Sequence, residues 1–560
     1  MTAEKNPSAI KARHAKGVAS SQKKLFFSGV LILTFSNIVI KIIGLLFKIP
    51  ITNIIGDEGM GYFNLTYVIY VWFYQISTSG LPTAVSLLTS ESRAKGNIRE
   101  VRRIFRISLI LFIIIGLVGM LVMMIGSGMF ARMMASPEID WCIIAIAPTL
   151  FFICISSSIR GYFQGYQNML PTAVSQLIEA LGKMILGILF AAYGIKAGFP
   201  LPTVAALAIS GLTIGAFGGM VFLVIARLDF KDTVYDAEYL TPESGSMPMQ
   251  SPKQLLTSLA VIAIPITLAA SMPSLTSLLD GAIIVRCLES AGFIHTEAIE
   301  IYGNYTSEAI PMFNLPPVLI YPISYSLIPL LTASISSKDK EGSAQMARAA
   351  IRAVFVIIAP CALGLAAMSE PILKMFYRAS SAEMAAPLLT LLAPAALFVG
   401  LLSITNAILQ SYGYERKPII SMVLGSVVKL ILSAVLVSQH SIGIKGAPIG
   451  TFVCYFTITA CNFYFLKKDV GMSMKILISL IKPLIAAGIC AASAILFHRL
   501  FTALHPGRIA VLASICGAAV VYFIAILLMK TITKEELELM PKGKKIYALL
   551  KKGQSGGMII

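Results

Sequence analysis

The sequence predicts an all-α integral membrane protein of about 14 transmembrane helices, in two homologous six-helix lobes plus two extra C-terminal helices. Composition is the first observation behind this prediction. The 560 residues are 57% hydrophobic and 13% charged, with a mean hydropathy of +0.82, whereas soluble domains carry about 25% charged residues. The second is that apolar runs recur along the whole chain, each long enough to cross a bilayer core as a helix.

The predicted spans follow one another with short polar interruptions. They are residues 25–48, 62–90, 104–126, 139–163, 171–194, 201–227, 255–285, 303–335, 349–373, 384–412, 418–439, 444–466, 475–498 and 508–530. The basic stretch 1–24 lacks the apolar core and cleavage site of a signal peptide, so we expect it to be a cytoplasmic head.

An internal repeat divides the spans into two sets. At offsets of 246, 246, 247 and 246 residues, Gln164, Tyr166, Pro171 and Lys183 return as Gln410, Tyr412, Pro418 and Lys429. This period indicates two homologous bundles, which could rock about a cavity and give alternating access. The expected domains are an N-lobe at 25–228, a cytoplasmic linker at 229–254, a C-lobe at 255–467, two further spans at 468–530 and a cytoplasmic tail at 531–560.

The formal net charge of +18 follows the predicted topology. If the N-terminus is cytoplasmic, 33 of the 45 Lys and Arg lie in the loops, span ends and tails of that side. This bias predicts that both termini face the cytoplasm and that the partner is membrane lipid, without a nucleic acid. The eight cysteines and five histidines show no CxxC or i,i+4 pair, so no metal and no cofactor are expected.

Basic residues inside predicted spans are the first candidates for function, because a charge in mid-membrane costs at least ~2.5 kcal/mol. Lys41 has no carboxylate three or four residues away, which favours contact with an anionic substrate over snorkelling or pairing with another span. Lys48 follows two turns later on the same face, nearer the outer surface. Lys183 has Glu179 four residues before it, so a local ion pair and a binding role both remain open. Lys429 has no such neighbour, which favours binding.

Polar residues in the second and later spans complete the predicted site. Asn64, Tyr67, Tyr74 and Gln75 share one helical face, as expected for a cavity wall that binds sugar, with helix–helix contact as the alternative. Two acidic residues, Asp280 and Glu308, could carry a coupling proton or sodium ion. Because both lie near a span end, interfacial carboxylates are the alternative.

Two motifs carry a family resemblance. They read SGLPTAVSLLTSESRAKGN at 79–97 and IRGYFQGYQNMLPTAVSQLIE at 159–179. Over about residues 25–530 the chain resembles the SpoVB-type polysaccharide-biosynthesis proteins of the multidrug/oligosaccharidyl-lipid/polysaccharide exporter superfamily, kin of the MurJ lipid II flippases. In MurJ-like relatives a basic-x-x-Gly element of the first span lines the cavity, and Lys41-Ile42-Ile43-Gly44 matches it with lysine in place of arginine.

The resemblance implies a V-shaped pair of lobes that flips an undecaprenyl-pyrophosphate-linked glycan from the cytoplasmic to the outer face of the bacterial cytoplasmic membrane. Lipid II or a related lipid-linked oligosaccharide would be the substrate, and the cell-wall synthesis machinery would be a candidate partner. Transport would be coupled to Na⁺, to H⁺ or to the membrane potential. A drug/cation antiporter is the first alternative, although it would need an anionic cavity. A glycan polymerase or ligase is the second, but the longest outer loop, 286–302, offers few acid or base groups. The leading prediction is therefore not an enzyme.

Overall fold

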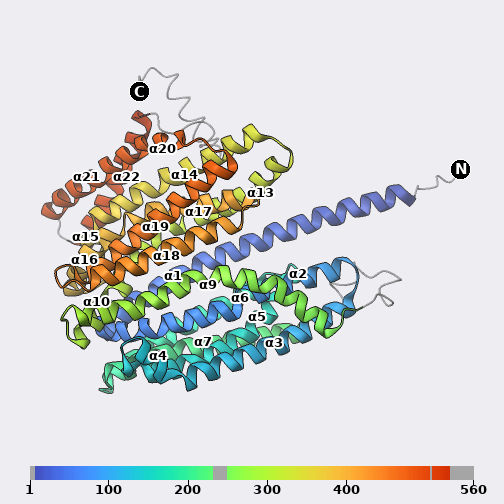
Figure 1. Ribbon diagram of the computed structural model, residues 1–560, viewed down its shortest axis with the longest axis horizontal. Helices are drawn as coiled ribbons and strands as arrows, with labels where there is room; N and C mark the ends of the chain where they lie inside the picture. The colour runs from blue at the N-terminus through green and yellow to red at the C-terminus, as the bar shows by residue number, and fades with distance from the viewer. Residues whose placement is uncertain (1–6, 231–248, 505–506, 530–560) are drawn as a thin grey trace. The chain divides into compact units, whose positions relative to one another are not determined.

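The computed structural model describes residues 7–230, 249–504 and 507–529 (Figure 1). Within these ranges the regular elements are helices and no strand is present, which confirms the predicted all-α class. The chain divides into two compact units, Met1–Leu278 and Leu279–Ile560, called unit 1 and unit 2 below. The units meet inside one helix, whereas the predicted linker 229–254 falls largely on residues 231–248, outside the described part. The linker and the tail 531–560 stay predictions.

Unit 1 contains the spans of the predicted N-lobe. Its helices are α1 (Pro7–Thr78), α2 (Gly80–Ala94), α3 (Ile98–Ile125), α4 (Ser127–Met133), α5 (Asp140–Gly165), α6 (Leu170–Lys196), α7 (Leu201–Asp229) and the first part of α9 (Pro252–Ser290). The helix α3 packs against α5, α5 against α7, and α7 against α6.

The described helices account for the predicted number of spans. Twelve helical stretches are long and apolar enough to cross a membrane, or 13 with the bent pair Ala379–Leu392 and Ala395–Ser411. The stretch Phe35–Ala94 has 60 residues, about three times the length that a ~30 Å bilayer core requires. Gly56, with φ 73°, breaks the helix inside this stretch, between the predicted spans 25–48 and 62–90. The stretch Phe35–Ala94 therefore contains two spans, which brings the number of spans to the predicted value of about 14.

Glycines bring α6 and α7 into close contact. A Cβ atom added at Gly215 of α7 would lie 2.8 Å from the carbonyl oxygen of Glu179 and 3.0 Å from the amide nitrogen of Lys183 on α6. Gly211, Gly215 and Gly219 form a small-xxx-small stripe, which lets helix backbones approach in a membrane. This contact fixes where α6 presents Glu179 and Lys183.

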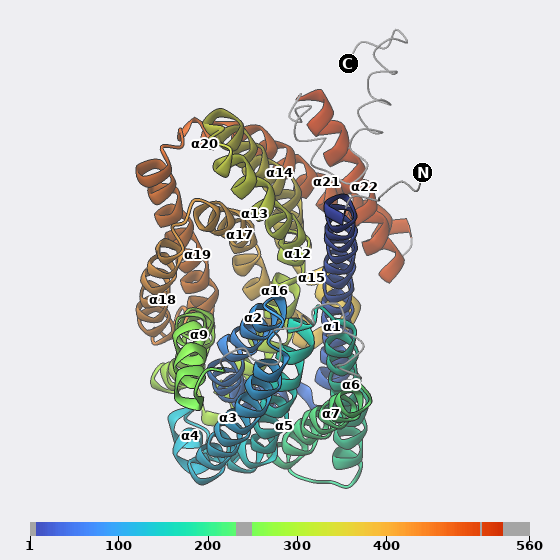
Figure 2. The ribbon, with the colours of Figure 1, turned by 90° about the vertical axis from the view of Figure 1, so that its right-hand side faces the viewer.

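Unit 2 contains the rest of α9 and the predicted C-lobe from residue 279 onward, while residues 255–278 of that predicted lobe belong to unit 1. Its further helices are α10 (His295–Asn304), a π-helical turn (Tyr305–Ala309), α11 (Ile310–Phe313), α12 (Leu315–Val318), α13 (Tyr321–Ser336), α14 (Lys340–Ala367), α15 (Ser369–Phe376), α16 (Ala379–Leu392), α17 (Ala395–Ser411), α18 (Arg416–Val437), α19 (Gly446–Phe465), α20 (Lys475–Ser479), α21 (Ile481–Leu504) and α22 (Arg508–Leu528). The two extra C-terminal helices, α21 and α22, lie side by side (Figures 1 and 2), and α21 packs on α14.

The sequence repeat is visible in the local backbone. The amide of Asn168 donates to the carbonyl of Phe163 at 3.0 Å where α5 ends, and the amide of Tyr414 donates to the carbonyl of Leu409 at 2.9 Å where α17 ends. Both bonds close the six-residue loop of a Schellman C-cap, and each cap has one residue at positive φ, Gln167 or Gly413. The 246-residue offset therefore relates the backbone conformation of the two helix ends as well as their sequences.

Candidate functional site

A cationic and aromatic cluster in unit 1 joins four of the predicted site residues. The Lys48 Nζ donates a 2.6 Å hydrogen bond to Oδ1 of Asn64, which is 5% exposed. The break at Gly56 separates the α1 segment that carries Lys48 from the segment that carries Asn64 and Tyr67. The Lys48 side chain is half-buried and is hydrogen-bonded to protein.

Lys183 of α6 lies over the aromatic rings of the same cluster. Its Nζ is 4.4 Å from the ring centroid of Tyr67, 5.0 Å from Phe47 and 5.9 Å from Phe63. Each ring face presents the negative part of its quadrupole to the ammonium group. The Phe63 ring centroid also lies 6.0 Å from the Nζ of Lys48, so both ammonium groups lie about equally far from one ring.

The predicted alternative of a Lys183–Glu179 ion pair is wrong. The Oε1 of Glu179 accepts instead from the Nη2 of Arg160 on α5, and the Arg160 Nε donates to Ser175 at 3.0 Å. The side chains of Arg160 and Glu179 are only 6% and 14% exposed. A guanidinium group satisfies a buried carboxylate better than an ammonium group, because its planar fork of donors is preorganised. Glu179 is therefore paired with Arg160 and does not neutralise Lys183.

The cluster carries positive charge without a carboxylate. Among the described residues no ion pair includes Lys48 or Lys183, whose neighbours are an amide oxygen and three π faces. Cations inside a membrane protein need a counter-charge or water. Lys48 and Lys183 therefore face an amide oxygen and aromatic rings in place of a carboxylate.

An aromatic ladder continues from the cluster along α1. Phe63, Tyr67, Tyr70 and Tyr74 follow at spacings of four, three and four residues, with ring centroids 5.9–6.0 Å apart. Sequence reasoning found Tyr67 and Tyr74 but missed Phe47, Phe63 and Tyr70, although the i, i+4, i+7 spacing of 63, 67, 70 and 74 was a usable signal. Gln75, also predicted, is half-buried, and its Oε1 accepts from Ser79 at 2.7 Å.

Lys41, the leading candidate from the sequence, lies on α1 seven residues before Lys48, about 10 Å along the helix axis. Its side chain is exposed on the isolated chain. Its binding role stays a prediction.

Lys429 in unit 2 has a partner that local spacing cannot reveal. Its Nζ lies 2.8 Å from Oδ2 of Asp280, 149 positions away in sequence, and the two side chains are 14% and 10% exposed. Lys429 therefore has a carboxylate partner on another helix although none lies three or four residues away, and its binding role stays a prediction. Asp280 faces an ammonium group, which competes with the sodium ion or proton that was predicted for it.

Glu308 is completely buried in unit 2, at 0% exposure. It stands in the π-helical turn Tyr305–Ala309, whose Ser307 carbonyl accepts from the Tyr377 hydroxyl at 3.2 Å. Single π turns inside helices often mark functional sites. Both Glu308 and Asp280 are buried by protein, and the interfacial alternative, which concerns their depth in the membrane, stays open. A coupling role for Glu308 stays a prediction.

A metal centre has no visible basis in the described ranges, where no group of three or more His, Cys, Asp or Glu side chains is placed to hold an ion.

Repeated apolar helices with cations placed among them define a multi-pass membrane protein of the transporter type. A model of the polysaccharide biosynthesis protein family matches residues 26–335. The match covers more than half of the chain, so the chain belongs to this family. A MatE model also matches residues 307–435.

Curated relatives confirm the resemblance drawn from the two motifs. The lipid II flippase MurJ of Bacillus subtilis (strain 168) is 26% identical over 465 residues, 80% of this chain and 84% of that protein. Stage V sporulation protein B of the same strain is 25% identical over 529 residues, 93% of this chain and 98% of that protein.

Solved structures show the same fold. A lipid II flippase MurJ in an inward closed conformation has a TM-score of 0.66 at 14% identity, covering 90% of this chain and 99% of that one. An inward-facing multidrug resistance MATE transporter has a TM-score of 0.64 at 13% identity, covering 79% of this chain and 98% of that one.

Proposed function

We propose that this protein is a flippase that carries a polyprenyl-pyrophosphate-linked glycan, lipid II or a related lipid-linked oligosaccharide, from the cytoplasmic to the outer face of the membrane by alternating access. The observation that carries the proposal is the Lys48 and Lys183 cluster, in which no described carboxylate pairs with either cation. A pyrophosphate supplies the missing negative charge. The relative named as a lipid II flippase supports the same substrate class.

The cluster argues against the drug antiporter that the shared fold would also allow. A cationic drug would meet two ammonium groups in a medium of low dielectric, where like charges repel strongly. A pyrophosphate head would be attracted instead, and leaving a cytoplasm that is negative inside favours its export by up to ~4.6 kcal/mol for two charges at 100 mV. The membrane potential therefore favours export, and Na⁺ or H⁺ coupling through Glu308 is the second proposed source of energy.

Transport by purified protein tests the proposal. Proteoliposomes would receive fluorescent lipid II, an undecaprenyl-pyrophosphate monosaccharide and a cationic drug in parallel. We expect flipping of the glycan lipids, faster with an imposed potential, and recovery of each lipid chemically unchanged, as for a carrier that is not an enzyme. Export of the drug without glycan flipping would overturn the proposal.

The proposed direction of transport requires both termini on the cytoplasmic side of the bacterial membrane. Positions 245 and 292 test this orientation, although 245 lies outside the described residues. In a cysteine-free background, we expect Gly292→Cys to react with an impermeant thiol reagent in whole cells and Gly245→Cys to be protected. The reverse pattern would invert the topology and with it the direction of export.

A further inference from the structure

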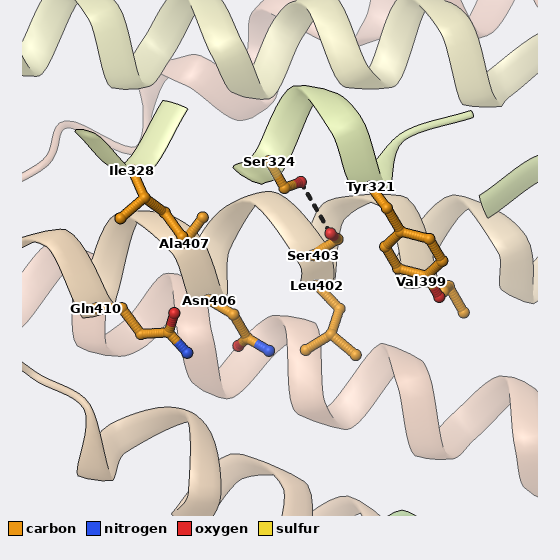
Figure 3. Close-up of a pocket in the computed structure, with 9 residues that line it drawn as sticks. All are labelled: Tyr321, Ser324, Ile328, Val399, Leu402, Ser403, Asn406, Ala407 and Gln410. Carbon is orange, nitrogen blue, oxygen red and sulfur yellow. Dashed lines mark hydrogen bonds between the residues drawn. The ribbon is translucent and has the colours of Figure 1, made fainter. Parts of the chain in front are cut away.

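A cavity in unit 2 has the wrong chemistry for a pyrophosphate and the right chemistry for a sugar. It lies between α13 and α17, measures about 220 Å³, and has no charged side chain in its lining. Its polar lining consists of Tyr321, Ser324, Ser403, Asn406 and Gln410 (Figure 3). This is less than the ~300–1,000 Å³ of a drug-sized site, so it suits one small polar group.

Helical spacing places these polar groups together. Ser403, Asn406 and Gln410 follow at i, i+3 and i+7 on α17, so they share one face. Figure 3 shows the Asn406 and Gln410 amides projecting from the same side of this helix. Val399 and Leu402 add an apolar wall. A pyranose ring needs both parts, since its hydroxyls are polar and its C–H faces are apolar.

Hydrogen-bonding capacity is left over in this cavity. Oδ1 of Asn406 accepts from Nδ2 of Asn462 at 2.7 Å, which leaves the Asn406 Nδ2 donors for another acceptor. The Gln410 amide makes no hydrogen bond with a described residue and is exposed. Ser403 donates to Ser324 at 2.8 Å and keeps its own acceptor lone pairs.

The repeat explains why this site is neutral. At the offset of 246 residues, Arg160 and Glu179, which form the buried ion pair of unit 1, correspond to Asn406 and Gly425. Unit 2 therefore has an uncharged amide at the position of Arg160 and a glycine at the position of Glu179. The two repeats have diverged, and unit 2 presents uncharged donors and acceptors where unit 1 closes an ion pair.

We propose that the α13/α17 cavity is a glycan subsite that binds one sugar ring of the transported lipid. This proposal rests on the proposed function and adds to it a second recognition element. The Asn406 and Gln410 amides bind ring hydroxyl or N-acetyl oxygens, and the Val399 and Leu402 wall packs on the ring.

Binding to the full-length protein in nanodiscs tests the subsite with three probes: sugar-free undecaprenyl pyrophosphate, undecaprenyl-pyrophosphate-N-acetylglucosamine and lipid II. We expect the wild type to bind the two sugar-bearing lipids more tightly. The double variant Asn406→Ala/Gln410→Ala should lose about tenfold in affinity for both, as for one or two lost hydrogen bonds, and should bind the sugar-free probe as before. Ser411→Ala on the same helix, outside the cavity lining, is the matched control.

Three outcomes overturn the subsite. Equal losses for all probes would indicate a structural role, no loss would remove the site, and a loss confined to lipid II would assign the cavity to the peptide stem. If the double variant does not fold, Gln410→Met replaces an exposed amide by a chain of similar length and must show the same sugar-dependent loss. A wild type that binds no pyrophosphate lipid at all would instead overturn the proposed function itself.

Discussion

Replacing Lys183 by glutamate should abolish glycan-lipid flipping while leaving a folded protein. The ammonium group of Lys183 faces the rings of Phe47 and Tyr67 at 5.0 and 4.4 Å and pairs with no described carboxylate. A carboxylate there would face the negative ring faces and repel the substrate phosphate. Losing one charge-assisted contact costs about 1.5–3 kcal/mol, and reversing the charge adds to it. We expect at least a ~100-fold loss of flipping rate at equal protein level, since 1.4 kcal/mol corresponds to tenfold.

The controls for Lys183 come from the same helix and the same cluster. Lys196→Glu, at the exposed end of α6, should leave flipping almost unchanged, because solvent screens a surface charge. Lys183→Arg should retain activity, since a guanidinium group also stacks on aromatic rings. Lys48→Ala should be impaired as well, because it removes the second cation beside Phe63. A fully active, normally expressed Lys183→Glu protein would remove the cationic cluster from the mechanism.

Much of the fold could be predicted because its signals are local or periodic. Apolar run length defines the spans, and the 246-residue offset defines the repeat, which returns as matching C-caps at Asn168 and Tyr414. The merged stretch Phe35–Ala94 arises because the connection between two predicted spans is helical on both sides of a single break at Gly56.

The candidate site was only partly predictable, because its partners come from other helices. Spacing on α6 allowed Glu179 to pair with Lys183, but Arg160 of α5 forms the ion pair with Glu179 instead. Asp280 of α9 and Lys429 of α18 are far apart in sequence, and their side chains meet only in the folded chain. Sequence reasoning missed the α13/α17 cavity, because its polar residues come from two helices that meet only in the fold, although the spacing of Ser403, Asn406 and Gln410 was a usable signal.

Lys429 occupies the repeat position that corresponds to Lys183, but it pairs with Asp280. We therefore expect its replacement to reduce stability, whereas replacement of Lys183 should reduce flipping. Lys429→Met should destabilise the protein by about 3–5 kcal/mol, because it leaves the carboxylate of Asp280 buried without its ammonium partner. In the double variant Asp280→Leu/Lys429→Met both charges are gone. Replacing a buried pair by apolar groups of similar volume is often neutral, so most of the stability should return. Thermal unfolding of purified protein in detergent measures both effects, and the two single variants complete the double-mutant cycle.

Transport by the double variant then separates a structural pair from a binding lysine. If Lys429 serves only to neutralise Asp280, the rescued protein should flip glycan lipids at a rate close to that of the wild type, in contrast to Lys183→Glu. A stable double variant without activity would return Lys429 to the substrate site that the sequence predicted for it. A Lys429→Met protein as stable as the wild type would mean that the 2.8 Å contact contributes little to stability. The ion pair would then not explain why Lys429 should have a different role from Lys183.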